Sequence, residues 1–271
     1  MPRLMAALLP LLMPVGLTAQ MAGLGGAVAE ADLLYFAGAP RMAFERLEDH
    51  LAADPLDYAA LWRAARSAVA LGIREEGSRA QNAWLDPAIL LAQRAVDARP
   101  LGLEGIYWHG VAAGRRAMNA GPGYAAELAQ IVRDDARAIL AVDSAHGGAH
   151  NMLGKLSYEV MSLSVLERLL ARTFLGGDAL DDTSWEKAEH HLRRAAEAWP
   201  QVVLFHYDLA ELYRKRDRRR EAVEELGHVL ALVPIHPVDA SVQEEARALL
   251  EEWGAGDGIA AVDPVGDHDG R

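Results

Sequence analysis

The sequence predicts an all-α protein built as a solenoid of helical hairpins. A motif of small and large apolar residues recurs along the chain, and most copies close at a proline. The composition is rich in Ala and Leu, with only 6% aromatic residues. The alternating β-branched runs that are typical of strands do not occur in the sequence. These observations predict about five irregular repeats, followed by a C-terminal capping helix.

The repeat is most regular around Pro200 and Pro234, which lie 34 residues apart. In each copy a small, a large and a second small apolar residue stand twelve, eight and five positions before the proline. This period is typical of the tetratricopeptide repeat, a helix–turn–helix unit that buries its apolar face only against neighbouring units. The proline ends the second helix because it lacks an N–H and disfavours helical geometry in the preceding residue. The matching residues are Ala188, Leu192 and Ala195 in one copy and Ala222, Leu226 and Val229 in the next.

Three earlier copies become visible once insertions are allowed. They close at Pro55, at Pro100 and, in a weaker form, at Asp143-Ser144. Only the last unit, 203–236, is free of insertions. We therefore expect extra residues between the paired helices of the earlier repeats. This excess length falls at residues 72–84, 116–125 and 160–184.

The first 19 residues have the layout of a secretory signal peptide, with Arg3, an apolar stretch over 4–17 and small residues after it. That stretch is shorter than the roughly 20 residues that a spanning helix needs. Cleavage near Ala19 and cleavage near Ala29 both fit the pattern. An uncleaved, membrane-anchoring N-terminus is the alternative. We expect an exported protein, periplasmic or extracellular, with no transmembrane segment in the mature chain.

The rest of the chain is expected to form one elongated domain with a tail. The segment from about Asp239 to Trp253 has apolar residues at helical spacing and no partner repeat, so it should cap the solenoid. The last residues are rich in Gly and Asp without periodicity, as in a disordered acidic tail. The predicted organisation is a signal peptide over 1–19, a linker over 20–29, a tetratricopeptide-like solenoid domain over 30–253 and a tail over 254–271.

Composition and motifs argue against several classes of function. A formal net charge of −12 disfavours nucleic acid and anionic membranes as main partners. The chain has no cysteine, which excludes disulfides, thiolate nucleophiles and cysteine metal ligands. Glu186 and His190 share one helix face, but no complete metal, nucleophile or phosphate-loop motif accompanies them. We therefore expect no catalytic residues, no bound metal and no cofactor.

One basic segment, from Arg214 to Arg220, stands out against this acidic background. It falls at the turn of the last repeat. A solvated turn near a helix C-terminus is the simpler interpretation, because basic side chains are favourable there. The alternative is a docking patch for an acidic partner or an anionic headgroup.

In a solenoid of this kind the first helices of the hairpins line a concave surface. Three of the four residues at the fifth position of the repeat are aromatic, in a chain with few aromatic residues. Aromatic and Arg side chains are frequent hot spots of recognition. Packing of the same rings between adjacent repeats is the alternative. The predicted partner-binding residues are Trp62, Arg66, Tyr107, Arg115, Asn151, Lys155, Tyr158, Tyr207 and Arg214.

These features predict a non-enzymatic scaffold that binds a protein or peptide in its concave groove, in the cell envelope. The alternative is a carrier of a lipid or another apolar ligand, with the amphipathic segment 160–184 as a lid. If the aromatic residues contact the ligand, replacing Tyr107 and Tyr207 by Ala should weaken binding and leave melting unchanged.

Two segments also carry a resemblance to a known family. They are GAHNMLGKLSYEVMSLSVLERLLARTFLGG, with its Leu153-Gly154 pair followed by Arg168 and Arg172, and SWEKAEHHLRRAAEAWP. Over about residues 40–253 the chain resembles the regulators of microtubule dynamics. The resemblance implies a helical, non-enzymatic adaptor, and eukaryotic relatives are linked to microtubules and to lipid transfer at membrane contact sites. A predicted export signal and a bacterial-looking composition separate this chain from a cytoskeleton, so microtubule regulation is not carried over.

Overall fold

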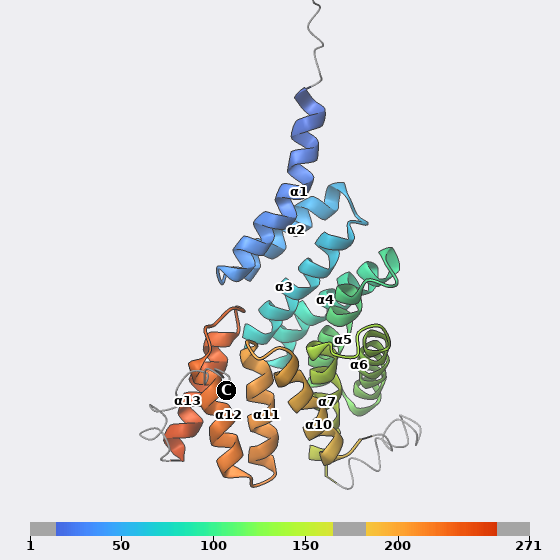
Figure 1. Ribbon diagram of the computed structural model, residues 1–271. Coiled ribbons are helices and arrows are strands. Elements are labelled where there is room, and N and C mark those ends of the chain that lie inside the picture. Colours follow the sequence, from blue (N-terminus) through green and yellow to red (C-terminus); the bar gives the residue numbers. More distant parts are fainter. Residues whose placement is uncertain (1–14, 165–182, 254–271) are drawn as a thin grey trace, which may run out of the picture.

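Every regular element in the part of the chain that the structure describes is an α-helix (Figure 1). The computed structural model describes residues 15–164 and 183–253. Within these ranges the helices pair into five hairpins and one further helix follows, which confirms the predicted solenoid. The hairpins are α1 (Val15–Phe36) with α2 (Pro40–Ala53), α3 (Tyr58–Arg74) with α4 (Ser78–Ala98), α5 (Leu103–Ala117) with α6 (Pro122–Val142), α7 (Gly147–Ser162) with α10 (Trp185–Ala198), and α11 (Val203–Lys215) with α12 (Arg219–Ala231), and α13 (Asp239–Glu252) ends the series.

The extra residues of the early repeats lengthen helices and do not form long connections. α4 and α6 each contain 21 residues, whereas α10 and α12 contain 14 and 13. Gly77, just before α4, has a φ of +81°, a left-handed conformation that favours glycine and allows a short turn. The sequence placed the excess residues 72–84 and 116–125 between the paired helices, but most of them lie within α3, α4, α5 and α6. Most of the segment 160–184, including the lid of the carrier hypothesis, lies outside the described residues.

The N-terminal part differs from the expected organisation. α1 runs without a break through residues 20–29, where the sequence suggested a linker. Ala27 is 1% exposed, so this residue already belongs to the packed structure. Cleavage near Ala29 would remove Ala27 from the packing, whereas cleavage near Ala19 would not. Among the described helices, none combines the length and the apolar character required to span a bilayer.

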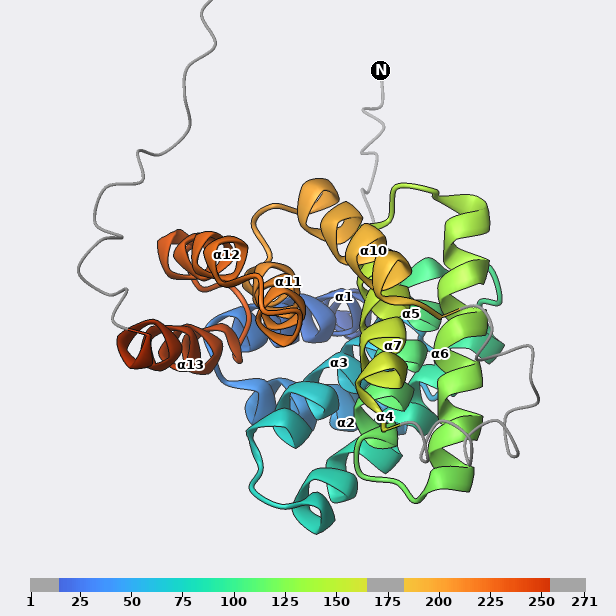
Figure 2. The same cartoon turned by 90° about the horizontal axis from the view of Figure 1, so that it is seen from below.

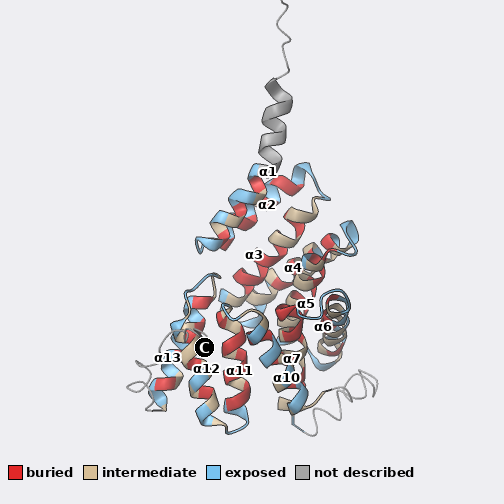
Figure 3. Ribbon diagram, viewed as in Figure 1, coloured by how far each residue is buried: buried red, intermediate tan, exposed pale blue. Residues whose placement is uncertain are grey.

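The repeat motif forms the core between the helices, where Figure 3 shows the buried residues on the sides that face one another. All six motif residues of the last two repeats are at most 1% exposed. Burial of each Leu in the motif stabilises the fold by about 1.5–3 kcal/mol. α13 adds Val242, Ala246 and Leu250 to the cluster formed by α11 and α12. Its apolar face is thus covered, as expected of a capping helix.

The solenoid curves so far that its two ends approach each other. Tyr35 and Phe36, at the end of α1, each place their ring centroid 6.1 Å from that of His236. His236 lies in the turn between α12 and α13, and Figure 1 shows this turn next to the end of α1. The first hairpin and the capping helix are therefore neighbours although they are far apart in the sequence.

Within the fourth hairpin, α7 and α10 approach each other closely at Gly154. A Cβ at this position would lie 2.7 Å from Cγ of Leu192 and 2.9 Å from its backbone N, closer than real side chains come. Gly114 of α5 differs, because the nearest atom to a Cβ there is Cγ2 of Val132 at 3.4 Å. Of these two glycines, only Gly154 is needed for the approach of two helices.

Replacing Gly154 by Ala should lower the free energy of unfolding by about 1–3 kcal/mol, because the added methyl group forces α7 and α10 apart. Gly114→Ala is the matched control. Its methyl group has room, and Ala favours a helix over Gly by up to about 1 kcal/mol, so this variant should be at least as stable as the wild type. Urea unfolding of both variants measures the difference, and a Gly154→Ala protein of wild-type stability would contradict the close contact.

Candidate binding surface

The predicted binding residues lie on α3, α5, α7 and α11, the first helices of their hairpins. In Figure 2, α3, α7 and α11 lie toward the middle of the curve, with α6, α10 and α12 outside them. Burial raises the pKa of Tyr107 well above its usual value, and the charges of Glu104, Arg115 and Asp208 also act on it. Arg115 and Asp208 belong to α5 and α11, so helices of different hairpins bring charged side chains to the surroundings of Tyr107.

The centre of the α7–α11 contact is the buried carboxylate of Asp208, which is 4% exposed. Asn151 donates its Nδ2–H to Oδ2 at 2.9 Å, and the Nζ of Lys155 lies 3.0 Å from Oδ1. Burial disfavours the charge of Lys155, but Asp208 and then Glu159 outweigh this effect and raise its pKa. Two donors thus compensate a carboxylate that would be costly to bury alone.

Tyr207 and Arg214 occupy the open side of α11. The Oη–H of Tyr207 donates to Glu245 of α13 at 3.0 Å. Burial raises the pKa of Tyr207 strongly, with further contributions from Glu211 and Glu245. Arg214 donates two hydrogen bonds to Glu211, at 2.8 and 2.7 Å, and its side chain remains 45% exposed. Tyr207 and Arg214 therefore stay at least partly accessible, each with an acidic neighbour.

Arg66 fastens α1 to α3, and Trp62 packs beside it. The Nη2–H of Arg66 donates to Oδ1 of Asp32 at 2.6 Å, and Arg63 donates to Oδ2 of the same carboxylate at 2.8 Å. The guanidinium of Arg66 lies 3.8 Å from the ring centroid of Tyr35 and 5.3 Å from that of Trp62. Arg66 is 5% exposed. Its contacts are those of a residue that holds two hairpins together.

Tyr107 packs between repeats. Its ring centroid lies 5.6 Å from that of His146 and 6.4 Å from that of Trp199. A Cβ on Gly148 would come within 2.4 Å of the Tyr107 ring, so the backbone of α7 rests directly on it. Tyr107 therefore has the surroundings expected of a ring that packs between adjacent repeats, the alternative to a role in partner binding. Its replacement by Ala should lower the melting temperature, contrary to the expectation stated above for the pair of tyrosines.

Arg115 differs from the other three cations among the predicted contact residues. It lies in the last turn of α5 and is partly exposed. Arg66, Lys155 and Arg214 each have a carboxylate partner, whereas Arg115 has neither a hydrogen bond nor an ion pair with any residue of the described chain. Its charge acts on both Tyr107 and Lys155. Arg115 is thus a cation beside the α7–α11 contact whose partner is not provided by the described residues.

The basic segment 214–220 is largely engaged with the protein itself. Arg218 contacts Glu189 at 2.6 Å and Glu221 at 2.9 Å. Arg219 donates to the backbone carbonyl of Trp253, and Arg216 lies 5.3 Å from the ring centroid of Trp185. These contacts favour the simpler interpretation, a solvated turn that ties neighbouring helices together.

Comparison with known proteins agrees with the fold. The family model of the Regulator of microtubule dynamics protein 1-3 matches residues 27–254. The chain belongs to this family. The match begins at the buried Ala27, within α1, and continues past the end of α13, so it includes the last part of α1, the following hairpins and the cap. No curated protein matches the chain.

Solved structures that resemble this chain include tetratricopeptide proteins. TTC0263, a thermophilic TPR protein in Thermus thermophilus, is 21% identical with a TM-score of 0.56, and the match covers 84% of this chain and 99% of that one. This likeness shows the fold alone. MamA from Desulfovibrio magneticus RS-1 is 15% identical with a TM-score of 0.44, and the match covers 83% of this chain and 96% of that one.

The nine residues predicted to bind a partner thus have different surroundings, and their role in binding stays a prediction. The structure brings Asn151, Lys155, Tyr158, Tyr207 and Arg214 together along α7 and α11. Sequence reasoning missed the acidic residues that organise them. Asp208 carried a usable signal, because it is an acidic residue between the inward-facing positions of α11. Asp32 carried none, because α1 lay outside the repeats that the sequence pattern defined.

Replacing Asp208 by Asn should lower the free energy of unfolding by about 1–3 kcal/mol, because Lys155 would keep its charge without the carboxylate. The side chain of Lys155 is 28% exposed, so solvent reduces the cost below that of a fully buried charge. Glu159→Gln is the control, since it breaks the more exposed pair with Lys155 at 3.6 Å and should cost at most about 1 kcal/mol. Equal losses in chemical denaturation would show that Asp208 does not organise the contact.

The N-cap of α7 should make stability depend on pH. Nδ1 of His146 accepts a hydrogen bond from the backbone N–H of Ala149 at 3.1 Å, so it must be unprotonated. Burial lowers the pKa of His146 below 6.5, which means that the unfolded chain takes up the proton first. The contribution of His146 is therefore fully present above about pH 6.5 and is lost as the pH falls toward the folded pKa.

His146→Asn keeps an N-cap acceptor without a titrating ring. Urea unfolding at about pH 8 and pH 5 should show a smaller loss of stability in this variant than in the wild type. Burial also lowers the pKa of His150, but that residue is present in both proteins and cancels in the comparison. The same pH dependence in both proteins would disprove the role of the His146 cap.

Proposed function

We propose that the protein is a non-enzymatic scaffold that binds a protein or peptide on its concave side, where an acidic group of the partner pairs with Arg115. The fold supports this proposal, because repeat solenoids present extended concave surfaces that serve in binding. The lack of a partner for Arg115 within the described chain is the observation that carries it.

The chemistry of the surface favours a carboxylate as the group that Arg115 binds. A guanidinium matches a carboxylate with two parallel hydrogen bonds, and partial burial strengthens such a pair. Arg115 also acts against the rise in the pKa of Lys155, so the two cations influence each other. A ligand carboxylate next to Arg115 would relieve this repulsion. Asp208 forms an ion pair with Lys155 but not with Arg115, so the charge of Arg115 is not compensated.

The accessible side chains next to this position suit a peptide. Tyr207 presents a partly exposed ring, and Arg214 and Glu211 present a donor and an acceptor. Tyrosine combines a large contact area with a polar hydroxyl group at low entropic cost. A bound segment would extend from Arg115 across α7 toward α11.

A carrier of a lipid is the rival proposal. The described chain has an open cavity of about 370 Å³, but it lies at the α1–α2 and α3–α4 turns, away from the predicted contact residues. Its lining combines Met42 and Leu71 with the charged Arg41, Arg74 and Glu75. Such a lining does not favour an acyl chain. The location in the cell envelope is part of our proposal and rests on the predicted signal peptide.

A pull-down from the native envelope fraction tests the proposal. Arg115→Ala should reduce recovery of the partner protein by at least about tenfold, since a charged hydrogen bond contributes roughly 1.5–3 kcal/mol. Tyr207→Ala should also reduce it. Arg115→Ala should keep the helix content and melting temperature of the wild type, because Arg115 has no partner in the described chain. Tyr207→Ala should also melt at a lower temperature, because Tyr207 packs against the core of the last repeat and donates to Glu245, so Arg115→Ala is the decisive variant.

Arg79→Ala is the matched control, because Arg79 is an exposed arginine in the first turn of α4, away from the concave side. Its recovery of the partner should equal that of the wild type. Equal recovery by Arg115→Ala and Arg79→Ala would overturn the proposed site. Native mass spectrometry of the purified protein distinguishes the rival, because a co-purifying lipid would favour the carrier.

A further inference from the structure

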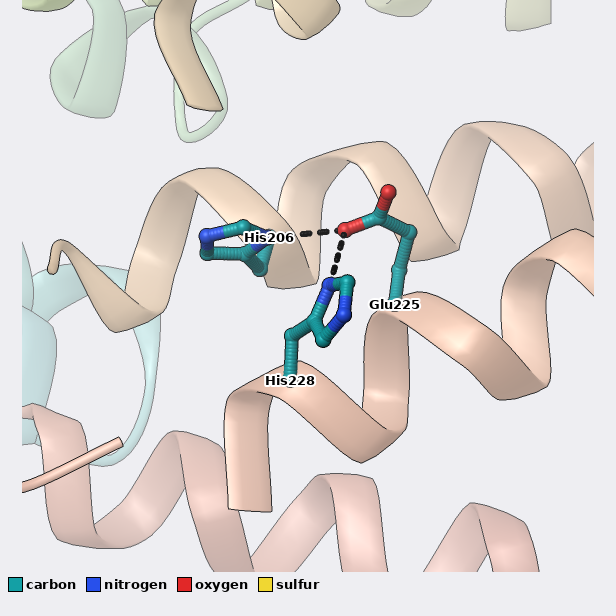
Figure 4. A group of neighbouring side chains, drawn as sticks. All are labelled: His206, Glu225 and His228. Carbon is teal, nitrogen blue, oxygen red and sulfur yellow. Dashed lines mark hydrogen bonds and ion pairs between the residues drawn. The ribbon is translucent and has the colours of Figure 1, made fainter. Parts of the chain in front are cut away.

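Three potential metal ligands converge between α11 and α12, away from the predicted contact residues (Figure 4). His206 belongs to α11, and Glu225 and His228 stand three residues apart on α12. Nδ1 of His206 lies 2.8 Å from Oε2 of Glu225, and Nδ1 of His228 lies 3.5 Å from the same oxygen. All three ligand atoms lie within 4.8 Å of one another.

The hydrogen bonding of His206 determines which of its nitrogens is available. Nε2 lies 3.0 Å from the backbone carbonyl of Pro200. A carbonyl oxygen only accepts, so Nε2 carries the proton and the neutral ring has its lone pair on Nδ1. That lone pair faces the carboxylate of Glu225, which also only accepts. Either a second proton or a cation must lie between the two atoms, and metal-binding histidines characteristically use the other nitrogen to donate to a carbonyl.

His228 adds an independent observation. Its Nδ1 is buried and has no hydrogen-bond partner among the described residues. A buried polar atom without a partner is unfavourable, and here the atom lies beside Glu225 and toward His206 (Figure 4). The His228 side chain as a whole is 44% exposed, which leaves room for solvent at the same site. One cation would satisfy both imidazole nitrogens and the carboxylate.

Two other histidine clusters show what is specific to this site. His150 is the fourth residue of α7, as His206 is of α11, and its Nε2 likewise lies 3.1 Å from a carbonyl of the preceding turn, that of Ser144. Its Nδ1 faces His191 at 2.9 Å and not a carboxylate. His50 does face a carboxylate, but Asp57 serves as the N-cap of α3 by accepting from two backbone N–H groups.

We propose that His206, Glu225 and His228 bind a divalent transition metal ion through Nδ1, a carboxylate oxygen and Nδ1. Two imidazoles and one carboxylate form a ligand set typical of zinc with an open position for water. The ion would link α12 to α11 and, through the Nε2–H of His206, to the turn at Pro200. Metal binding would therefore stabilise the last repeat.

Zinc titration of the tag-free, chelator-treated full chain tests this site. We expect one equivalent of Zn²⁺ to bind, and Co²⁺ in its place to give the visible absorption of a low-symmetry site with nitrogen and oxygen ligands. Glu225→Gln and His228→Ala should each weaken binding by at least about tenfold. Zinc at a hundredfold excess over Kd should raise the melting temperature by about 5–10 °C in the wild type and by less in these variants.

His150→Gln is the matched control, because it removes an equivalent histidine and its bond to a preceding carbonyl without changing the three ligands. It should bind zinc as the wild type does. The test replaces His228 and not the buried His206, because the His228 side chain is 44% exposed and its loss should not disturb folding. Absence of stoichiometric zinc binding, or equal affinity in the wild type, Glu225→Gln and His228→Ala, would overturn the proposal.

Discussion

The structure depends on the close packing of helical hairpins that cannot bury their apolar faces alone. Small residues on one helix admit a large residue from its neighbour, as Gly154 of α7 admits Leu192 of α10. Because the same arrangement recurs in successive hairpins, their small relative rotation adds up along the chain. This accumulated curvature brings Tyr35 and Phe36 to His236 and makes the two ends of the solenoid neighbours.

Curvature also decides the character of the concave side. Helices from different repeats place acidic groups next to basic ones, so Asp32 holds Arg66 and Asp208 holds Lys155. These pairs position the side chains and leave little free charge for a ligand. Of the four cations predicted to contact a partner, only Arg115 lacks a carboxylate partner in the described chain, and we therefore propose that an acidic group of the partner pairs with it.

Histidines connect the turns between repeats to the hairpins that follow. His146 caps α7, and His150 and His206 bind the carbonyl of a preceding turn in the same way. His150 and His206 thereby pair with carbonyl groups in the turns that precede α7 and α11, at Ser144 and Pro200. Of these three histidines, only His206 has its second ring nitrogen close to both a carboxylate and another histidine. The contact between α11 and α12 therefore contains the three side chains that we propose as metal ligands.

The sequence by itself determined the helical class, the repeat, the buried motif residues and the cap, because all four follow from local spacing within about one repeat. Tertiary structure alone decided that insertions extend α4 and α6, that Tyr107 is a packed ring, and that Asn151 meets Asp208, 57 residues later. Which of the inward-facing side chains are paired depends on charges delivered from other hairpins. These pairings depend on the curvature of the whole array, so they cannot be predicted from the spacing of residues along one helix.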